Sequence, residues 1–169
     1  SSNSPAEFSQ FFNQRLGALS RAHNLLIHGA WRGAALADIV REATHDFGDA
    51  IAVSGPSVTV SPEDTIALSL LLNELASNAR RHGALRAPQG SVAVDWHVEG
   101  ERLKLVWREH GGPATSAPDQ QGFGLRLIQM SARQIDGEIE MSFAREGFHA
   151  TLNMPAPRKS QTTSAPAFS

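Results

Sequence analysis

An acid and an amide stand one helical turn apart near the middle of the chain. Glu74 and Asn78 are separated by four positions in an apolar stretch, so a helix would place both side chains on one face. A carboxylate and an amide oxygen together can hold a hydrated Mg²⁺ that bridges nucleotide phosphates. Taken alone, the pair fits equally well a solvated Glu and Asn on an ordinary amphipathic helix.

A second carboxylate, that of Glu109, follows a strand pattern and stands just before Gly111 and Gly112. A carboxylate there can accept a hydrogen bond from an exocyclic amine such as that of adenine, and the two glycines would let the backbone approach a flat ring. The alternative is a turn with a solvent-facing Glu. We expect Trp107, two positions earlier, to lie in the core.

The third feature is a Gly-Phe-Gly segment, Gly122 to Gly124, at the start of a predicted helix. The first turn of a helix carries unpaired N–H groups and the positive end of the helix dipole, which together attract phosphate. Arg81, beyond Asn78 on the same predicted helix, would add positive charge near such phosphates. Each feature is weak alone, but the three supply the parts of an ATP site.

The first element that must support this site is a helix beginning at Ser4. Ser4, Pro5 and Glu7 form a capping box with Pro at the first helical position. Apolar side chains then recur every three or four residues in a narrow, nearly heptad-like stripe, which favours pairing with another helix. The stripe consists of Phe8, Phe12, Leu16, Leu19, His23 and Leu26. We expect Gly29 to end the helix and to let it project from the rest of the chain.

Downstream, helical and strand patterns follow one another in mixed order. The expected elements are a helix over 34–45, a hairpin of 51–53 with 58–60, a helix from Ser61 to about 81, strands 91–98 and 103–107, a helix over 124–135 and a hairpin of 138–143 with 148–154. Loops with Gly and Pro separate them. This order predicts an α/β domain, a two-layer sandwich of a mixed β-sheet and helices, with the first helix standing apart.

Composition restricts the possible partners and compartments. The chain has 169 residues, 41% of them hydrophobic, which is enough for one core. The net charge is −2 without a basic block, so we expect no contact with nucleic acid or with a membrane. Cysteine is absent, which excludes disulfides. With no long apolar stretch and no signal-peptide pattern, we expect a cytoplasmic domain.

The conjunction of motifs resembles the ATP-binding catalytic domain of sensor histidine kinases, within the group that includes gyrase and the mismatch-repair ATPases. Residues 73–78 look like the N box, 109–112 like the first glycine box and 122–125 like the second. The Trp-x-Glu pattern of 107–109 is similar to that of the HWE branch, and residues 15–26 resemble its second dimerisation helix. The branch usually carries His where Asn73 stands and often Ser where Leu125 stands, and the loop 112–122 is short.

The resemblance implies a Bergerat-type ATP-binding fold and a set of roles. It implies a partial dimerisation helix over 1–29, the catalytic domain over 30–155 and a disordered tail over 156–169. Glu74 would be catalytic, and Asn78 would hold Mg²⁺. The implied ATP-binding residues are Asn78, Arg81, Glu109, Gly111, Gly112, Gly122, Phe123, Gly124 and Leu125.

The same resemblance implies transfer of the ATP γ-phosphate to a histidine. An acceptor-helix signature is not recognisable in the sequence, and His23 lies on the apolar stripe, so we expect the acceptor on another helix or domain. A response regulator and a second copy of the chain are the other expected partners. Two alternatives remain: a regulatory or phosphotransfer module that acts by protein contact, of the anti-sigma type or with a decayed site, and a gyrase-like ATPase.

Overall fold

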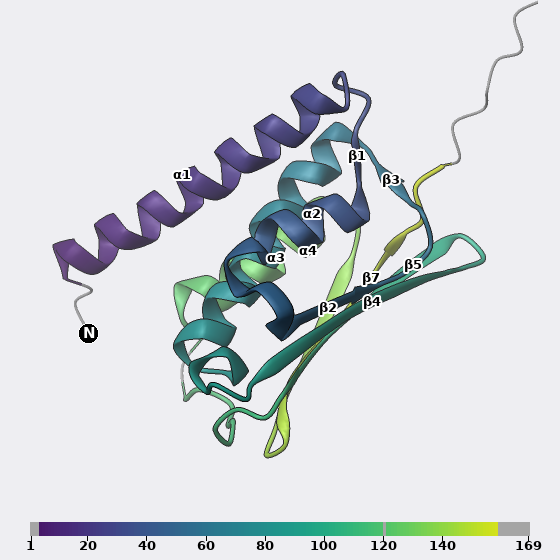
Figure 1. Ribbon diagram of the computed structural model, residues 1–169. Helices are drawn as coiled ribbons and strands as arrows, with labels where there is room; N and C mark the ends of the chain where they lie inside the picture. Colours follow the sequence, from purple (N-terminus) through teal and green to yellow (C-terminus); the bar gives the residue numbers. More distant parts are fainter. Residues whose placement is uncertain (1–3, 120, 159–169) are drawn as a thin grey trace, which may run out of the picture.

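The computed structural model describes residues 4–119 and 121–158 and has the predicted two-layer architecture (Figure 1). Helices α2 (Leu36–Ala43), α3 (Pro62–Arg81) and α4 (Phe123–Gln134) cover one face of a five-stranded sheet. Helix α1 (Pro5–His28) lies outside this helical layer, on the side away from the sheet. The mixed α/β sandwich expected from the element order is therefore confirmed.

The large sheet has the order β2-β4-β5-β7-β6. Its strands are β2 (Ile51–Ser54), β4 (Ser91–Glu99), β5 (Arg102–His110), β6 (Glu138–Ala144) and β7 (Gly147–Pro155). β2 pairs parallel with β4, and the other neighbours are antiparallel. Alternate residues of the central strands face the helices, as the period of two requires. On β5 these are Leu103, Leu105, Trp107 and Glu109.

The core lies between this sheet and the apolar face of α3. Leu68, Leu71, Leu72 and Leu75 of α3 are buried against it, and Trp107 is fully buried as expected. α3 begins with the Ser61 hydroxyl accepting a hydrogen bond from the Asp64 N–H. Such N-caps contribute about 0.5–2 kcal/mol.

The predicted hairpin of residues 51–53 and 58–60 is wrong. β2 joins the large sheet, whereas β3 (Thr59–Val60) pairs with the short strand β1 (Ala34–Ala35). The connecting turn is fixed on β4 instead: Trp96 Nε1 donates to the Pro56 carbonyl at 2.9 Å. A Cβ on Gly55 would lie 2.3 Å from the Trp96 ring, so only glycine fits under this indole.

The helix predicted over 34–45 is shorter than expected, because its first two residues form β1. α2 starts at Leu36 and ends at Ala43, and a 3₁₀ segment, η1 (His45–Ala50), leads into β2. A second 3₁₀ segment, η2 (Ala84–Arg86), follows α3 and has no signal in the sequence pattern.

Helix α1 packs on α3 with a different face from the predicted stripe. Its buried residues are Ala18, Ala22 and Leu26, and of these only Leu26 belongs to the stripe. Phe8 and Leu19, two residues of the stripe, are 68% and 41% exposed. All of residues 5–10 are exposed. The capping box of Ser4 and Glu7 is present as predicted.

Gly29 is the C-cap residue of α1, as the sequence predicted, and glycine is required there by packing. Its φ is −78°, and a Cβ there would lie 2.1 Å from the Gly33 carbonyl oxygen, so glycine serves a close backbone approach. The left-handed residues are Ala30 and Trp31, with φ of 51° and 60°. Backbone N–H groups of both close the helix end by donating to the Ile27 and Leu26 carbonyls.

Two further expectations concern the membrane and the carboxyl end. Within residues 4–119 and 121–158, no helix is long and apolar enough to cross a membrane. The Ala156 N–H donates to the Glu101 carbonyl at 2.8 Å, which fixes the end of β7 beside the β4–β5 turn. The remainder of the predicted disordered tail, 159–169, lies outside the described residues.

Candidate nucleotide site

Glu109 is the last helix-facing residue of β5. The earlier residues on the same side of β5 are apolar and buried. Glu109 continues this side, so its carboxylate points inward, beside Gly83 and Ala84 after the end of α3. Glu109 is only 1% exposed. A carboxylate this deeply buried needs hydrogen-bond donors, because an unpaired buried charge is strongly destabilising.

Both oxygens of Glu109 have such a donor. The Ala84 N–H donates to Oε2 at 2.9 Å, and Trp107 Nε1 donates to Oε1 at 3.1 Å. Burial raises the pKa of Glu109 above its ordinary value of 4.5, and the two hydrogen bonds partly oppose that rise. Each carboxylate oxygen has a second lone pair, so the group retains the capacity to accept a further hydrogen bond from a ligand.

Gly83 makes room for this arrangement. A Cβ on Gly83 would lie 2.0 Å from Oε2 of Glu109, so any larger residue would displace the carboxylate. Gly83, which directly follows the C-cap residue of α3, therefore shapes the site.

Glu74 and Asn78 share one face of α3, as their spacing predicted. Both face the beginning of α4, where a Cβ on Gly124 would lie 3.0 Å from Glu74 Oε2 and 3.7 Å from Asn78 Oδ1. Glu74 is 3% exposed, and Arg15 Nε of α1 lies 3.6 Å from its Oε1. Burial raises the pKa of Glu74, while the positive charges of Arg15 and Arg81 oppose the rise.

The first turn of α4 presents backbone N–H groups. Gly122 is the N-cap residue, and among the described residues no side chain caps the helix. The early N–H groups of a helix have no intrahelical acceptor, and together with the dipole they favour an anion.

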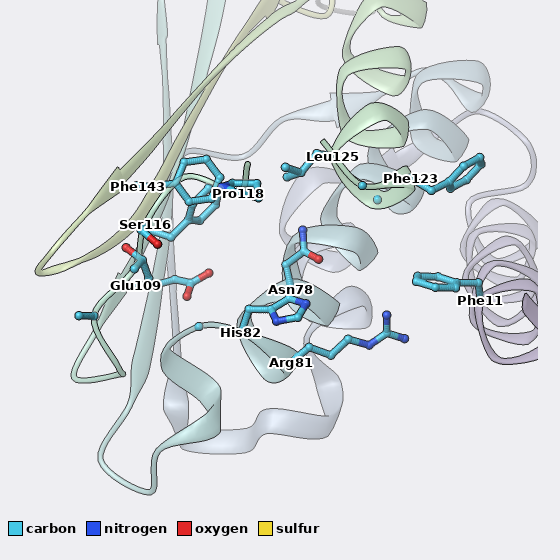
Figure 2. A pocket seen from close by; sticks show the side chains of 16 residues that line it. Phe11, Asn78, Arg81, His82, Glu109, Ser116, Pro118, Phe123, Leu125 and Phe143 are labelled. Carbon is cyan, nitrogen blue, oxygen red and sulfur yellow. The ribbon is translucent and has the colours of Figure 1, made fainter. Parts of the chain in front are cut away.

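These elements enclose one cleft of about 470 Å³, within the range of small-molecule sites. Figure 2 shows Glu109 and Phe143 on the sheet side, Phe11 and Phe123 on the opposite side, and Asn78 between them. Seven of the predicted site residues line it: Asn78, Arg81, Glu109, Gly122, Phe123, Gly124 and Leu125. The other three, Glu74, Gly111 and Gly112, lie outside its lining.

The two glycines after Glu109 serve the backbone around them. Gly111 has a φ of +74°, and a Cβ on it would lie 2.8 Å from the Gln89 carbonyl oxygen. A Cβ on Gly112 would lie 2.3 Å from Ala84 Cα. Both glycines thus let the loop after β5 pack closely on the segment 84–89. Because the Ala84 N–H binds Glu109, the glycines contribute to the site indirectly.

The sequence analysis missed several residues of the lining. Phe143 and Phe148, with ring centroids 5.0 Å apart, come from the β6–β7 hairpin, and His82 follows α3. The loop after Gly112 contributes Thr115, whose hydroxyl donates to the Ala144 carbonyl and ties the loop to that hairpin. The remaining unpredicted lining residues are Phe11, Gly83, Ala114, Ser116 and Pro118. The segments they come from meet only in the folded chain.

Comparison with known proteins assigns the chain. Residues 34–147, more than half of the sequence, match the family described as histidine kinase-like ATPase domain. The chain belongs to this family. Residues 1–57 match the family described as HWE histidine kinase, which confirms the branch expected from the Trp-x-Glu pattern and the first helix.

Among curated proteins, a blue-light-activated histidine kinase of Brucella anthropi is 38% identical over 152 residues. The alignment covers 85% of this chain and 31% of that protein, so the chain spans about a third of the relative's length. The chain is thus homologous to sensor histidine kinases and carries their ATPase-like domain.

Solved structures support the same fold. The histidine kinase domain of Erythrobacter litoralis EL346 blue-light-activated histidine kinase matches with a TM-score of 0.68 at 20% identity, over 85% of this chain and 74% of that one. The ATP-binding domain of PrrB from Mycobacterium tuberculosis matches with a TM-score of 0.55 at 19% identity, over 74% of this chain and 96% of that one. The fold expected from the motifs is therefore confirmed.

Proposed function

We propose that this chain is the ATP-binding catalytic region of a two-component sensor histidine kinase and transfers the γ-phosphate of ATP to a histidine on another helix or domain. The observation that carries the proposal is the convergence of Glu109, Asn78 and the start of α4 on one cleft. The carboxylate of Glu109 suits the amino group of adenine, and the amide oxygen of Asn78 suits a metal ion. The free N–H groups at the start of α4 suit phosphate.

In this proposal Glu109 accepts a hydrogen bond from the adenine amino group, while its other acceptor positions remain bonded to Ala84 and Trp107. The N–H groups that begin α4 bind the phosphates, and Arg81 adds positive charge. Glu74, behind Asn78 on α3, polarises the region of the γ-phosphate. Catalysis of phosphoryl transfer is mostly positioning and charge neutralisation, which these groups can supply.

Mg²⁺ fits the donors on this face of α3. The described residues contain no cluster of three or more His, Cys, Asp or Glu that could hold a metal, so an ion here would have few protein ligands. Mg²⁺ favours that situation, because it keeps water and takes phosphate oxygens as ligands. Asn78 would hold it, and the bound ion would neutralise charge on the phosphates.

The proposed partners follow from the family. We propose a response regulator that receives the phosphoryl group, a second copy of the chain that pairs through the exposed stripe of α1, and a cytoplasmic location. His23 is exposed on α1 beside Trp31, with ring centroids 5.2 Å apart, and is not part of the cleft lining. Its surroundings therefore give no reason to assign it as the acceptor.

The decisive experiment is calorimetric titration with a non-hydrolysable ATP analogue in the presence of Mg²⁺. Asn78→Asp should weaken binding about tenfold or more, which is about 1.4 kcal/mol. The change keeps the shape of the side chain but adds a negative charge beside the phosphates. Asn24→Asp is the matched control, because Asn24 is exposed on α1 and outside the cleft. Equal affinity of Asn78→Asp and the parent would remove Asn78 from the site.

A further inference from the structure

Helix α1 brings an arginine, Arg15, to the junction of α3 and α4, where it contacts the lining residue Phe123 but is not itself part of the cleft lining. The Arg15 guanidinium carbon lies 4.1 Å from the centroid of the Phe123 ring, and Arg15 Nε lies 3.6 Å from Glu74 Oε1. Phe123 is the first residue of α4, and Glu74 abuts Gly124. Arg15 therefore contacts the first residue of α4, the helix whose early N–H groups are expected to bind the phosphates.

Two of the three guanidinium nitrogens of Arg15 are buried and have no hydrogen-bond acceptor. Its Nε and Nη2 atoms are inaccessible to solvent and make no hydrogen bond to any described residue. The 3.6 Å separation from Glu74 is an ion-pair distance but too long for a hydrogen bond. Buried guanidinium donors without an acceptor are costly, so this arrangement is suited to a ligand that supplies acceptor oxygens.

The local charge also favours an anion. The carboxylate of Glu74 faces two positive charges, those of Arg15 and Arg81. Arg81 Nη2 donates to the neutral Gln14 Oε1 at 2.9 Å, and its guanidinium lies 4.7 Å from the Phe11 ring, so its charge is not neutralised by these contacts. With the α4 dipole added, the junction has a net positive potential.

A second arginine of α1 provides the contrast. Arg21 Nη2 donates to Asn73 Oδ1 at 3.0 Å and thereby anchors α1 to α3. Arg21 has a protein acceptor, and neither Arg21 nor Arg15 is among the residues that line the cleft. Arg15 differs in lacking such an acceptor, although both side chains come from the same helix and contact the same partner helix.

We propose that Arg15 binds the terminal phosphate of ATP, so that α1 completes the nucleotide site and lets it distinguish ATP from ADP. The proposal rests on the function proposed above and adds a specificity-determining residue from outside the ATPase-like domain. Guanidinium is well matched to phosphate because its N–H groups can donate in pairs to two oxygens. ADP lacks the group that Arg15 would contact.

The test is titration of the whole chain with ADP and with a non-hydrolysable ATP analogue, both with Mg²⁺. The parent should bind the ATP analogue more tightly than ADP. Arg15→Met should weaken the ATP analogue about tenfold to a hundredfold, the range for a hydrogen bond to a charged group. ADP affinity should stay within about twofold. Arg15→Lys keeps the charge and should lose less, and Arg21→Met should leave the ratio of the two affinities unchanged.

The possible failures are distinguishable. If the parent binds neither nucleotide, the proposed function itself is wrong. In a second case the parent binds both nucleotides, and each Arg15 variant weakens binding of ADP and of the ATP analogue by the same factor, or weakens neither. Arg15 then has a structural role only, and this inference is overturned. Tighter binding by Arg15→Met would also overturn it, because α1 would then obstruct the site. Thermal unfolding of each variant shows whether it is folded.

Discussion

The carboxylate of Glu109 is the residue on which the chemistry of the cleft most depends. It faces inward because it follows Leu103, Leu105 and Trp107 in the alternation of β5. The alternation of β5 that places apolar side chains in the core thus also places an ionisable group in the lining of the cleft. Two donors hold it in one orientation, so a ligand meets a preorganised acceptor.

Glu109 should give the site its preference for adenine. A carboxylate accepts from the amino group of adenine but is repelled by the oxygen that guanine carries at the same position, and an unpaired buried polar group costs about 1–3 kcal/mol. ATP should therefore bind the parent at least about tenfold more tightly than GTP, and Glu109→Ala should lose this preference. Competition titrations measure it, with the exposed Glu101→Ala as control. GTP competing as well as ATP on the parent would refute the adenine role.

The buried carboxylate should also affect stability in a pH-dependent way. Burial raises the pKa of Glu109 in the folded state above 4.5, so folding favours its protonated form. Its stabilising contribution is present at low pH and is lost as the pH rises through the folded pKa, by at most about 1.4 kcal/mol per pH unit. Urea unfolding from pH 4 to 8 should show the parent losing stability relative to Glu109→Gln as the pH rises. A difference that does not change, or that changes in the opposite direction, would show that Glu109 is not buried as described.

At the scale of elements, the parts of the site that the sequence predicted are those fixed by local pattern. The helix with Glu74 and Asn78 was recognisable from its Ser-Pro start and apolar repeat, and β5 from its alternation. The hairpin of 51–53 with 58–60 was wrong because a period of two identifies a strand but not its partner. Here the partner of β2 is the distant β4.

The packing face of α1 was missed for a related reason. The contact with α3 uses the small residues Ala18 and Ala22 and the charged side chains of Arg15 and Arg21. Small and charged residues do not form a recognisable apolar stripe in the sequence. The larger apolar residues formed a more prominent pattern, although most of them face away from α3. Phe11 likewise had no signal, since its role in the cleft depends on where α1 lies against α3 and α4.

At the scale of the whole molecule, α1 has two faces with different roles. One face packs on α3 and contributes Phe11 to the cleft lining. The other exposes most of the predicted stripe: Phe8, Phe12, Leu16 and Leu19. An exposed apolar row of this length on a helix is typical of a protein contact. Because the two faces are different, α1 can border the nucleotide site with one face and leave the other available for pairing with another helix.

We predict that this exposed row makes the chain self-associate. Leu19 lies on the exposed face and is 41% exposed, so Leu19→Glu would place a charge between paired helices while leaving the packing of α1 on α3 intact. Burying an unpaired charge is strongly unfavourable, and the variant should be monomeric at concentrations where the parent is dimeric. Sedimentation at micromolar concentration measures the association, and titration with the ATP analogue should give the same affinity for both. Ser20→Glu, at an exposed position outside the row, is the control that should remain dimeric. A parent that sediments strictly as a monomer would contradict the prediction and leave the row for a different helix.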